Sequence, residues 1–180
     1  MAQRLPPIFD VTPGGKYALS LPAPAQLSSV PQIMEIARRE TDTVGFLTGG
    51  CVERHIRGGN CLAVYDDADE CLVAFLVHGP LKPNCPVRVH QVAVGRPYRR
   101  CGVGSALVSA LASAAALSGC TSLQLACAAP LEANDFWHSC GFFRCRTEQR
   151  ENRRSRAVHT YRLSLTDSLF AESDCQLPLP

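Results

Sequence analysis

The 180-residue chain lacks several features that mark large classes of protein. None of its ten cysteines forms a Cys-x-x-Cys pair, so zinc-finger spacing is absent and no metal site is predicted. Its longest apolar run, 106–117, has twelve residues and includes two serines, whereas a membrane-spanning helix needs about 20. The net charge of +2 is too small to favour nucleic acid as the main partner.

The chain also has little lysine and no apolar run at its N-terminus. Residues 1–15 contain prolines and charges where a secretory signal peptide has apolar residues. We therefore expect a cytoplasmic protein whose cysteines are reduced, small, buried apolar residues. Sixteen of the 18 basic residues are arginines. This composition bias could also reflect anion binding, because arginine binds phosphates and carboxylates bidentately.

What the chain does contain is an ordinary globular composition, 46% hydrophobic and 19% charged, at a length typical of one domain. We interpret 1–25 as an extended, proline-rich arm with a short strand near Tyr17–Leu21. A single domain is predicted over 26–167, and 168–180 is a frayed tail. Helices are expected at 26–40, capped by Ser28 or Ser29, and at 44–57.

The centre of the chain changes its hydrophobic period. Two apolar runs, Cys61–Tyr65 and Cys71–Val77, predict a hairpin, and Val87–Val94 predicts a further strand. Strict alternation along that strand places Arg88, His90, Val92 and Val94 on one face, and Val89, Gln91 and Ala93 on the other. The rest predicts helices at 102–118 and 132–140, and strands at 121–127, 142–145 and 158–165.

One stretch carries a recognisable chemical signal. In Val92–Leu107, VAVGRPYRRCGVGSAL, a strand enters a glycine-containing turn that opens a helix. Backbone N–H groups at a helix start have no intrahelical partner, and the dipole there is positive. Gly102 and Gly104 permit a close backbone approach, and Arg99 and Arg100 add positive charge. The sequence therefore predicts a phosphate or pyrophosphate site at this turn.

This stretch resembles the acyl-CoA pyrophosphate loop of the GNAT acyltransferase superfamily, whose pattern is Q/R-x-x-G-x-G/A. Arg99, Gly102 and Gly104 occupy the matching positions. A second segment, NDFWHSCGF at 134–142, resembles the family's later helix, A-x-x-F-Y-x-x-x-G-F. The resemblance is strongest over 60–165. It implies an α/β (α+β) fold with a mixed, mostly antiparallel, twisted sheet flanked by helices on both faces.

The resemblance also implies acetyl-CoA as acyl donor and an amine, on a small molecule or a protein, as acceptor. It implies no metal, and a monomer or homodimer. The central strand's backbone would pair with the pantetheine arm and polarise the thioester carbonyl. The implied cofactor contacts come from the strand, the turn and the later helix: Val92, Ala93, Val94, Arg99, Arg100, Cys101, Gly102, Val103, Gly104, Ser105, Asn134, Phe136 and Trp137.

Within the family, the strand HQVAV is most similar to the arylalkylamine N-acetyltransferases. They carry a catalytic histidine at the position of His90, so His90 is the candidate general base, with a suitable pKa. It could also be a histidine that only bonds a neighbour. The second histidine position is Arg88 here, and the family's tyrosine acid is replaced by Trp137. The acid is therefore open among Tyr98, Tyr161, Cys140 and water.

These departures keep two alternatives to acetyl transfer open. The chain could be a non-catalytic acyl-CoA-binding regulatory module, or an acyltransferase that uses a longer acyl-CoA. Six arginines crowd 144–156, which we expect to be a charged loop or hairpin tip from Arg146 onward. They would form a solvated surface, or contact an acidic substrate or the adenosine 3′-phosphate.

Overall fold

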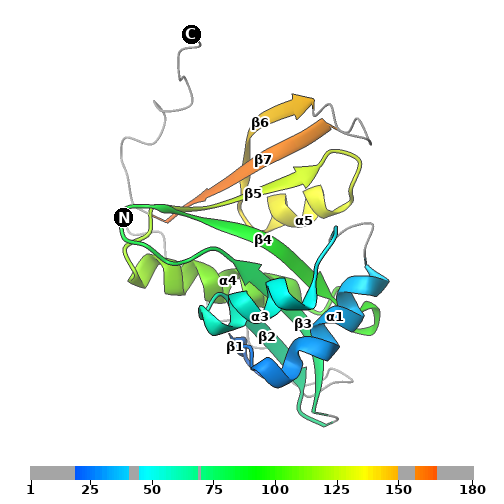
Figure 1. Ribbon diagram of the computed structural model, residues 1–180. Helices are drawn as coiled ribbons and strands as arrows, with labels where there is room; N and C mark the ends of the chain where they lie inside the picture. The colour runs from blue at the N-terminus through cyan, green and yellow to red at the C-terminus, as the bar shows by residue number, and fades with distance from the viewer. Residues whose placement is uncertain (1–18, 41–44, 69, 150–156, 166–180) are drawn as a thin grey trace.

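In a computed structural model, the described residues are 19–40, 45–68, 70–149 and 157–165. They form one seven-stranded sheet flanked by helices on both faces (Figure 1). The elements in chain order are β1 (Ala23–Pro24), the 3-10 turn η1 (Leu27–Ser29), α1 (Val30–Arg39), α3 (Gly49–Arg57), β2 (Cys61–Asp66), β3 (Cys71–His78), β4 (Pro86–Val94), the 3-10 turn η2 (Arg96–Tyr98), α4 (Val103–Leu117), β5 (Ser122–Ala128), α5 (Ala133–Ser139), β6 (Phe143–Gln149) and β7 (Ala157–Ser164).

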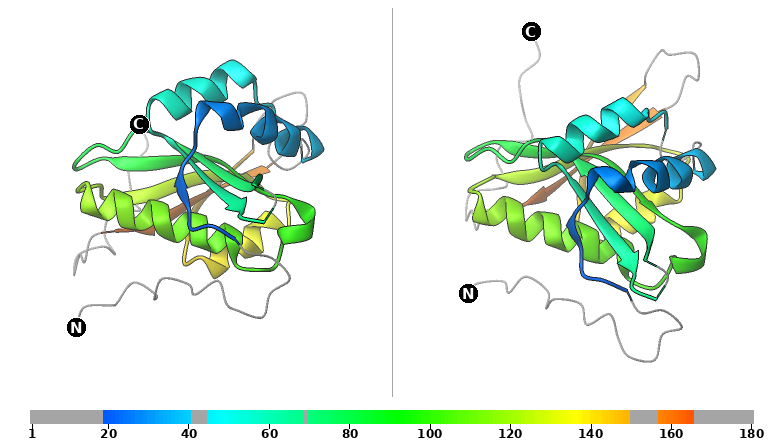
Figure 2. Two further views of the ribbon diagram at one scale, coloured as in Figure 1. Left: turned by 90° about the horizontal axis from the view of Figure 1, so that it is seen from below. Right: turned by 60° about the horizontal axis from the view of Figure 1, so that its bottom comes forward.

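The strand order is β1-β2-β3-β4-β5-β7-β6. Strands β4 and β5 run parallel, and the other neighbours are antiparallel. Helices α1 and α3 pack on one face, against β2, β3 and β4, whereas α4 and α5 pack on the other (Figure 2). This is the mixed, mostly antiparallel, helix-flanked sheet that the family resemblance implies.

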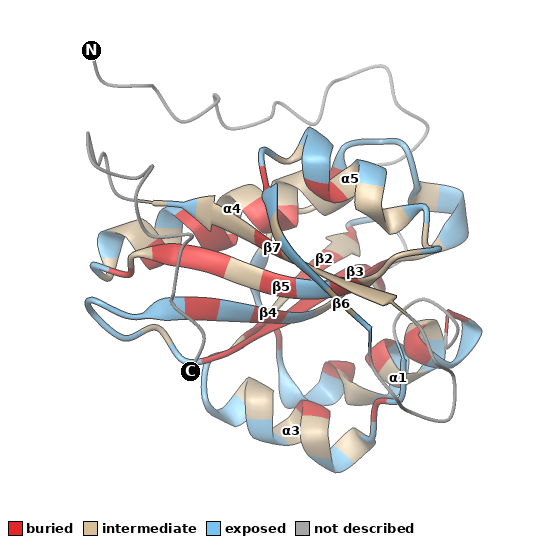
Figure 3. Cartoon of the chain, turned by 90° about the horizontal axis from the view of Figure 1, so that it is seen from above, coloured by how far each residue is buried: buried red, intermediate tan, exposed pale blue. Residues whose placement is uncertain are grey.

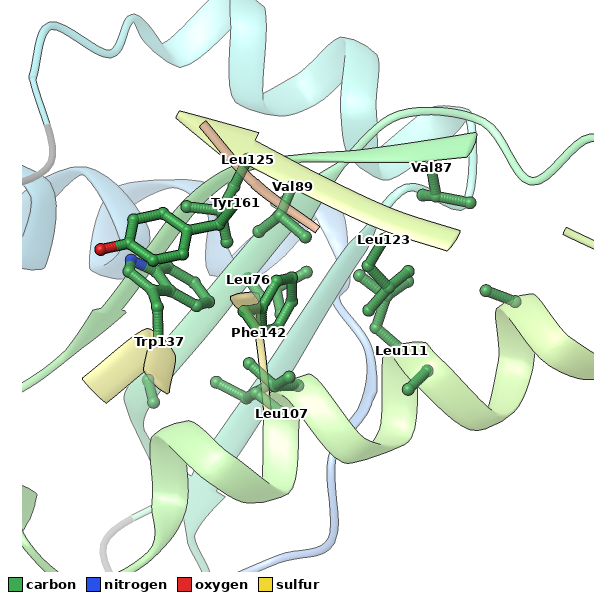
Figure 4. Packing of buried hydrophobic residues seen from close by; sticks show 14 of the residues in the cluster. Leu76, Val87, Val89, Leu107, Leu111, Leu123, Leu125, Trp137, Phe142 and Tyr161 are labelled. Carbon is green, nitrogen blue, oxygen red and sulfur yellow. The ribbon is translucent and has the colours of Figure 1, made fainter. Parts of the chain in front are cut away.

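Two apolar cores lie on the two faces of the sheet. The larger core joins the sheet to α4 and α5 and contains Leu107, Leu111, Leu123 and Tyr161 (Figure 4). The smaller core, which includes Phe75 and Ala93, lies under α1 and α3. Because side chains alternate along a strand, β3, which lies between the two cores, is buried on both faces (Figure 3).

The predicted helices are present, with changes at their starts. Pro31 lies in the first turn of α1, as expected. Ser29 does not cap that helix, because its hydroxyl bonds the Tyr65 hydroxyl instead. Helix α3 begins at Gly49, where the Thr48 side chain accepts from the Cys51 amide at 3.3 Å. The predicted start near residue 44 is therefore wrong, because the helix begins only after its N-cap, Thr48.

The strand predictions at the two ends of the chain also change. The expected strand near Tyr17–Leu21 lies partly outside the described residues. Leu19 forms a single bridge with Asp66, and β1 follows it. Strand β6 continues through Gln149, so the charged loop does not begin at Arg146. Pairing of β6 with β7 holds these polar residues in an extended conformation, and 150–156 lie outside the described residues.

Strand β4 breaks its alternation in the middle. Val77 of β3 pairs with Gln91, but His78 pairs with Val89, so His90 is the extra residue of a bulge. As a result Val89, Val92 and Val94 all pack against the α4 core. The predicted face shared by His90, Val92 and Val94 is therefore wrong, because the bulge shifts the register by one residue.

Candidate functional site

The two parallel strands at the centre of the sheet separate soon after they pair. Residues 86–88 of β4 pair with 122–124 of β5, and no further pairs join the two strands. From Val89 onward the β4 edge facing β5 therefore has no ladder partner in that strand. Backbone N–H and C=O groups need partners, so this edge can bind an extended ligand.

The glycine-containing turn lies at the carboxyl end of β4. Arg100 and Gly102 have positive φ angles of 62° and 79°. Gly102 is the N-cap of α4, provides no side-chain cap, and is followed by a first turn free of acidic residues. The amide of Ala106 bonds the Gly102 carbonyl at 2.9 Å. The preceding amides, 103–105, have no intrahelical acceptor, so the predicted anion site at this turn is structurally available.

The Arg99 side chain is already engaged within the protein. Its Nε donates to the Val94 carbonyl at 3.0 Å, and its Nη2 lies 2.6 Å from Glu40 Oε2. Arg96 pairs with the other oxygen of Glu40 at 3.2 Å. Arg99 therefore anchors the turn to the end of α1, whereas Arg100 has an exposed side chain.

Glu40 is a site-supporting residue that sequence reasoning missed. Its side chain is only 7% exposed. Burial by itself raises the pKa of this carboxyl, but the hydrogen bonds and charges of Arg99 and Arg96 outweigh burial and leave the pKa lowered. Glu40 thus stays ionised and ties both arginines of the turn to α1.

Gly104 is needed for packing between α4 and α5. A Cβ at this position would lie 3.1 Å and 3.2 Å from two ring carbons of Phe136 and 3.6 Å from the Val94 side chain. The absence of a side chain lets the start of α4 approach β4 and α5 closely. The Phe136 ring therefore packs against the start of α4 at Gly104.

Asn134 and Trp137 of α5 hold the site's framework. The Asn134 amide nitrogen donates to the carbonyls of Ala128, Ala129 and Leu131, and its oxygen accepts from the Tyr161 hydroxyl at 3.0 Å. Trp137 is 8% exposed and packs edge-on against Phe136 and Phe142. Its indole bonds the Cys127 thiol, whose pKa burial raises. Figure 4 shows its ring beside Tyr161, within the core.

His90 lies on the side of the sheet covered by α3. Its ring centroid is 5.3 Å from that of His55. His55 Nδ1 lies 3.0 Å from the His78 carbonyl oxygen, which can only accept, so Nδ1 carries the hydrogen. Desolvation lowers the pKa of His90, and the nearby charges of His55, Arg88 and His78 lower it further. A neutral imidazole at neutral pH is the form that accepts a proton.

The structure thus places the predicted residues in three groups. Val92–Val94 and Arg99–Ser105 surround the open end of β4, while His90 lies at the bulge near its middle. The third group, on α5, packs against or bonds the elements around the site: Asn134, Phe136 and Trp137. His55 and Glu40 had no sequence signal of their own, because each acts through a residue far away in the chain.

Among the described residues, no group of three or more histidine, cysteine or acidic side chains could hold a metal ion. The nine cysteines that the structure describes are all free, but only Cys61, Cys120 and Cys127 are buried, so the expectation of buried cysteines is wrong for the other six. No helix in the described ranges is long and apolar enough to span a membrane.

Comparisons with known proteins bear on this arrangement. Residues 30–142 match the family model of the acetyltransferase (GNAT) family. No curated protein sequence matches the chain significantly. The Ard1 structure from Thermoplasma volcanium superposes with a TM-score of 0.72 at 20% identity, covering 83% of this chain and 99% of that chain.

Two further structures show the same fold. The ribosomal-protein-S18-alanine N-acetyltransferase from Escherichia coli has a TM-score of 0.69 at 16% identity, covering 84% of this chain and 96% of that chain. The yncA protein of Salmonella typhimurium, solved with its cofactor acetyl-CoA, has a TM-score of 0.67 at 16% identity, covering 87% of this chain and 99% of that chain. With the family match over residues 30–142, these findings show that the chain belongs to the GNAT acetyltransferase family.

Proposed function

We propose that the protein is an acetyl-CoA-dependent N-acetyltransferase that transfers the acetyl group to a primary amine by direct attack in a ternary complex. The observation that carries the proposal is the opening between β4 and β5, with His90 where the two strands separate and the uncapped start of α4 at the other end. Family membership and a neighbour solved with acetyl-CoA support the choice of donor.

In this proposal the backbone does most of the binding. The amides at the start of α4, with Arg100 beside them, hold the pyrophosphate. The free edge of β4 pairs with the pantetheine arm, and its N–H groups near the bulge polarise the thioester carbonyl. Holding both reactants in one opening makes the attack effectively unimolecular.

His90 is proposed to take the proton that the acceptor must lose. An amine is mostly ammonium at neutral pH, and only the neutral amine attacks a carbonyl. His90 is exposed, and its lowered pKa keeps it unprotonated. It can therefore accept a proton directly or through one water.

No protein acid is proposed for the leaving thiolate. The Trp137 indole is buried against Cys127, and the hydroxyls of Tyr98 and Tyr161 donate to Asp66 and Asn134. Burial raises the pKa of Cys140. A thiol of ordinary pKa, about 8.5, leaves well as thiolate and takes its proton from water.

The decisive experiment measures CoA release from acetyl-CoA with a panel of primary amines. Turnover that depends on the amine, with an acetamide product identified by mass spectrometry, is the expected result. Tight CoA binding without turnover on any amine favours the non-catalytic module. Higher kcat/KM with butyryl-CoA or longer donors than with acetyl-CoA favours the long-chain alternative.

His90→Gln tests the base. We expect kcat/KM on the best amine to fall by roughly 10²–10⁴, with CoA affinity unchanged and the acidic limb of the pH–rate profile lost. His159→Gln, a histidine on β7 bonded to Thr147, is the matched control and should retain activity. A His90→Gln enzyme within about twofold of wild type, with its acidic limb intact, would rule out this role.

A further inference from the structure

A row of polar side chains crosses the sheet next to His90. We propose that Arg88, Gln124 and Arg162 form an anion subsite that holds a carboxylate of the acceptor, so the preferred acceptor is an amine that also carries an acidic group. The subsite deepens, and rests on, the proposed acetyl transfer.

Strand register places the three side chains side by side. Arg88 pairs with Gln124 across β4 and β5, and Gln124 pairs with Arg162 across β5 and β7. Paired strands lie about 5 Å apart, so the two arginine backbones are separated by about 10 Å. Arginine side chains are long enough to span this separation from both sides, so both guanidinium groups can contact one small anion between them.

All three side chains lie on the face opposite to α4 and α5. Their neighbours in sequence pack into the α4 core: Val87, Val89, Leu123, Leu125, Tyr161 and Leu163. Because side chains alternate along a strand, Arg88, Gln124 and Arg162 point away from that core. His90 is on this same face, since its ring meets His55 of α3.

The helices that cover the rest of this face do not cover the row formed by Arg88, Gln124 and Arg162. Helices α1 and α3 pack on β2, β3 and β4, whereas α5 packs on the opposite face of β5 (Figures 1 and 3). Arg88 is exposed, and Gln124 and Arg162 are half-buried. The row is therefore open to an acceptor that approaches His90.

The two guanidinium groups have unused hydrogen-bonding capacity. Arg162 Nε is buried and has no hydrogen-bond partner in the structure. Among the described residues, neither Arg88 nor Arg162 forms a salt bridge, whereas six salt bridges engage other arginines. A buried donor without a partner costs free energy, so a shift of the half-buried Arg162 side chain that presents Nε to a bound carboxylate is favourable.

The position of Arg88 links this charge to the chemistry. The charged and titratable groups that face His90 are His55 from α3, His78 from β3 and Arg88 from its own strand. Arg88 is always charged, so it favours the neutral imidazole that a base requires, but it also repels an incoming ammonium group. A carboxylate on the acceptor offsets this repulsion while it positions the amine.

The test uses amines in matched pairs that differ by a carboxylate. The pairs are phenylalanine with 2-phenylethylamine, lysine with cadaverine, and the dipeptides Ala-Glu and Ala-Gln, each with a free N-terminal amine and an amidated C-terminus. We expect at least one carboxylated member to have a kcat/KM at least about tenfold above its neutral partner. In Arg162→Gln and Arg88→Gln this preference should fall at least tenfold through KM. In Arg162→Gln, whose strand is two positions away from that of His90, kcat on the neutral partner should also stay within about twofold. Arg57→Gln, on the surface of α3, is the control and should keep it.

Each failure has its own signature. Amine turnover without preference for any carboxylated member overturns the subsite and leaves the proposed function standing. A loss of CoA affinity in Arg162→Gln or Arg88→Gln also overturns it, because the arginines would then serve the cofactor. If no amine is acetylated, calorimetry with glutarate on the CoA-bound protein decides. Binding that weakens at least tenfold in both variants supports the subsite, and absence of binding to wild type sinks it.

Discussion

Glu40 shows how one buried charge can hold in place the turn that we propose as the anion site. It lies at the end of α1, yet its two oxygens hold Arg96 and Arg99 of the segment that follows β4. A buried carboxylate that loses both partners would be strongly disfavoured. The turn is therefore fixed to α1 before any anion reaches it, which reduces the ordering cost of binding.

We expect Glu40→Gln to lower the free energy of unfolding by about 1–2 kcal/mol at pH 7, because charge-assisted hydrogen bonds are lost. The folded-state pKa of Glu40 is lowered, so the unfolded chain binds more protons in acid. Its contribution is thus full above the ordinary carboxyl pKa and lost as the pH falls through the folded value. Urea unfolding at pH 7 and at pH 4 measures the difference, which should shrink at pH 4.

Glu53→Gln is the control for this prediction, because Glu53 pairs with Arg57 on the exposed surface of α3. Surface pairs of this kind contribute about 0–1 kcal/mol. If Glu40→Gln costs no more than Glu53→Gln, or costs the same at both pH values, Glu40 does not anchor the turn.

The start of α4 is the element on which the proposed cofactor site depends. Its N-cap glycine has a positive φ, and its first turn has neither a side-chain cap nor an acidic residue. The second glycine, Gly104, meets Phe136 instead of solvent. The element thus leaves amides free at its tip and packs tightly behind it.

Gly104→Glu and Gly104→Ala together separate charge from packing. Alanine adds only the Cβ that crowds Phe136, whereas glutamate also adds negative charge near the pyrophosphate. We expect Gly104→Glu to weaken CoA binding by at least about tenfold, or 1.4 kcal/mol, beyond the loss in Gly104→Ala. Titration calorimetry on folded variants measures both. Equal affinities for the two variants would contradict a pyrophosphate site at this turn.

The whole molecule is built from two cores that the central strands share. Buried cysteines belong to both cores: Cys61 to the smaller, and Cys120 and Cys127 to the larger. Cys85 and Cys101 lie on the surface. Thiol reactivity can therefore report on global unfolding and local exposure in one experiment.

Pulsed alkylation with mass spectrometry should modify Cys85 and Cys101 in the native protein while Cys61, Cys120 and Cys127 stay protected. Cys61 is 1% exposed, and burial raises its pKa to about 12, so little reactive thiolate forms. In denaturant without reductant, all ten cysteines of the chain should react, with the buried ones following one cooperative transition. Labelling of Cys61 as fast as Cys101 would contradict the packing described.

Much of the fold could be predicted because its signals are local. The strand–turn–helix at 92–107 depends on an apolar strand, two glycines and an apolar helix face that are contiguous in the chain. The hairpin of β2 and β3 follows from two apolar runs around an acidic turn, and it is confirmed. The predicted start of α3 is wrong because Thr48 is the N-cap and the helix begins only at Gly49, and the predicted end of β6 is wrong because pairing with β7 extends the strand through polar residues.

The amino-acid order alone was sufficient to indicate the family and to predict the turn that we propose as the anion site, because both depend on residues close together in sequence. Folding determined which side chains surround His90. The bulge at His90 arises from its pairing with β3, and this pairing turns the histidine toward His55 and away from Val92. Glu40 reaches Arg99, and Arg88 lines up with Arg162, through helix packing and strand register that span most of the domain. Such contacts leave no local pattern, because their geometry is set by where distant elements pack.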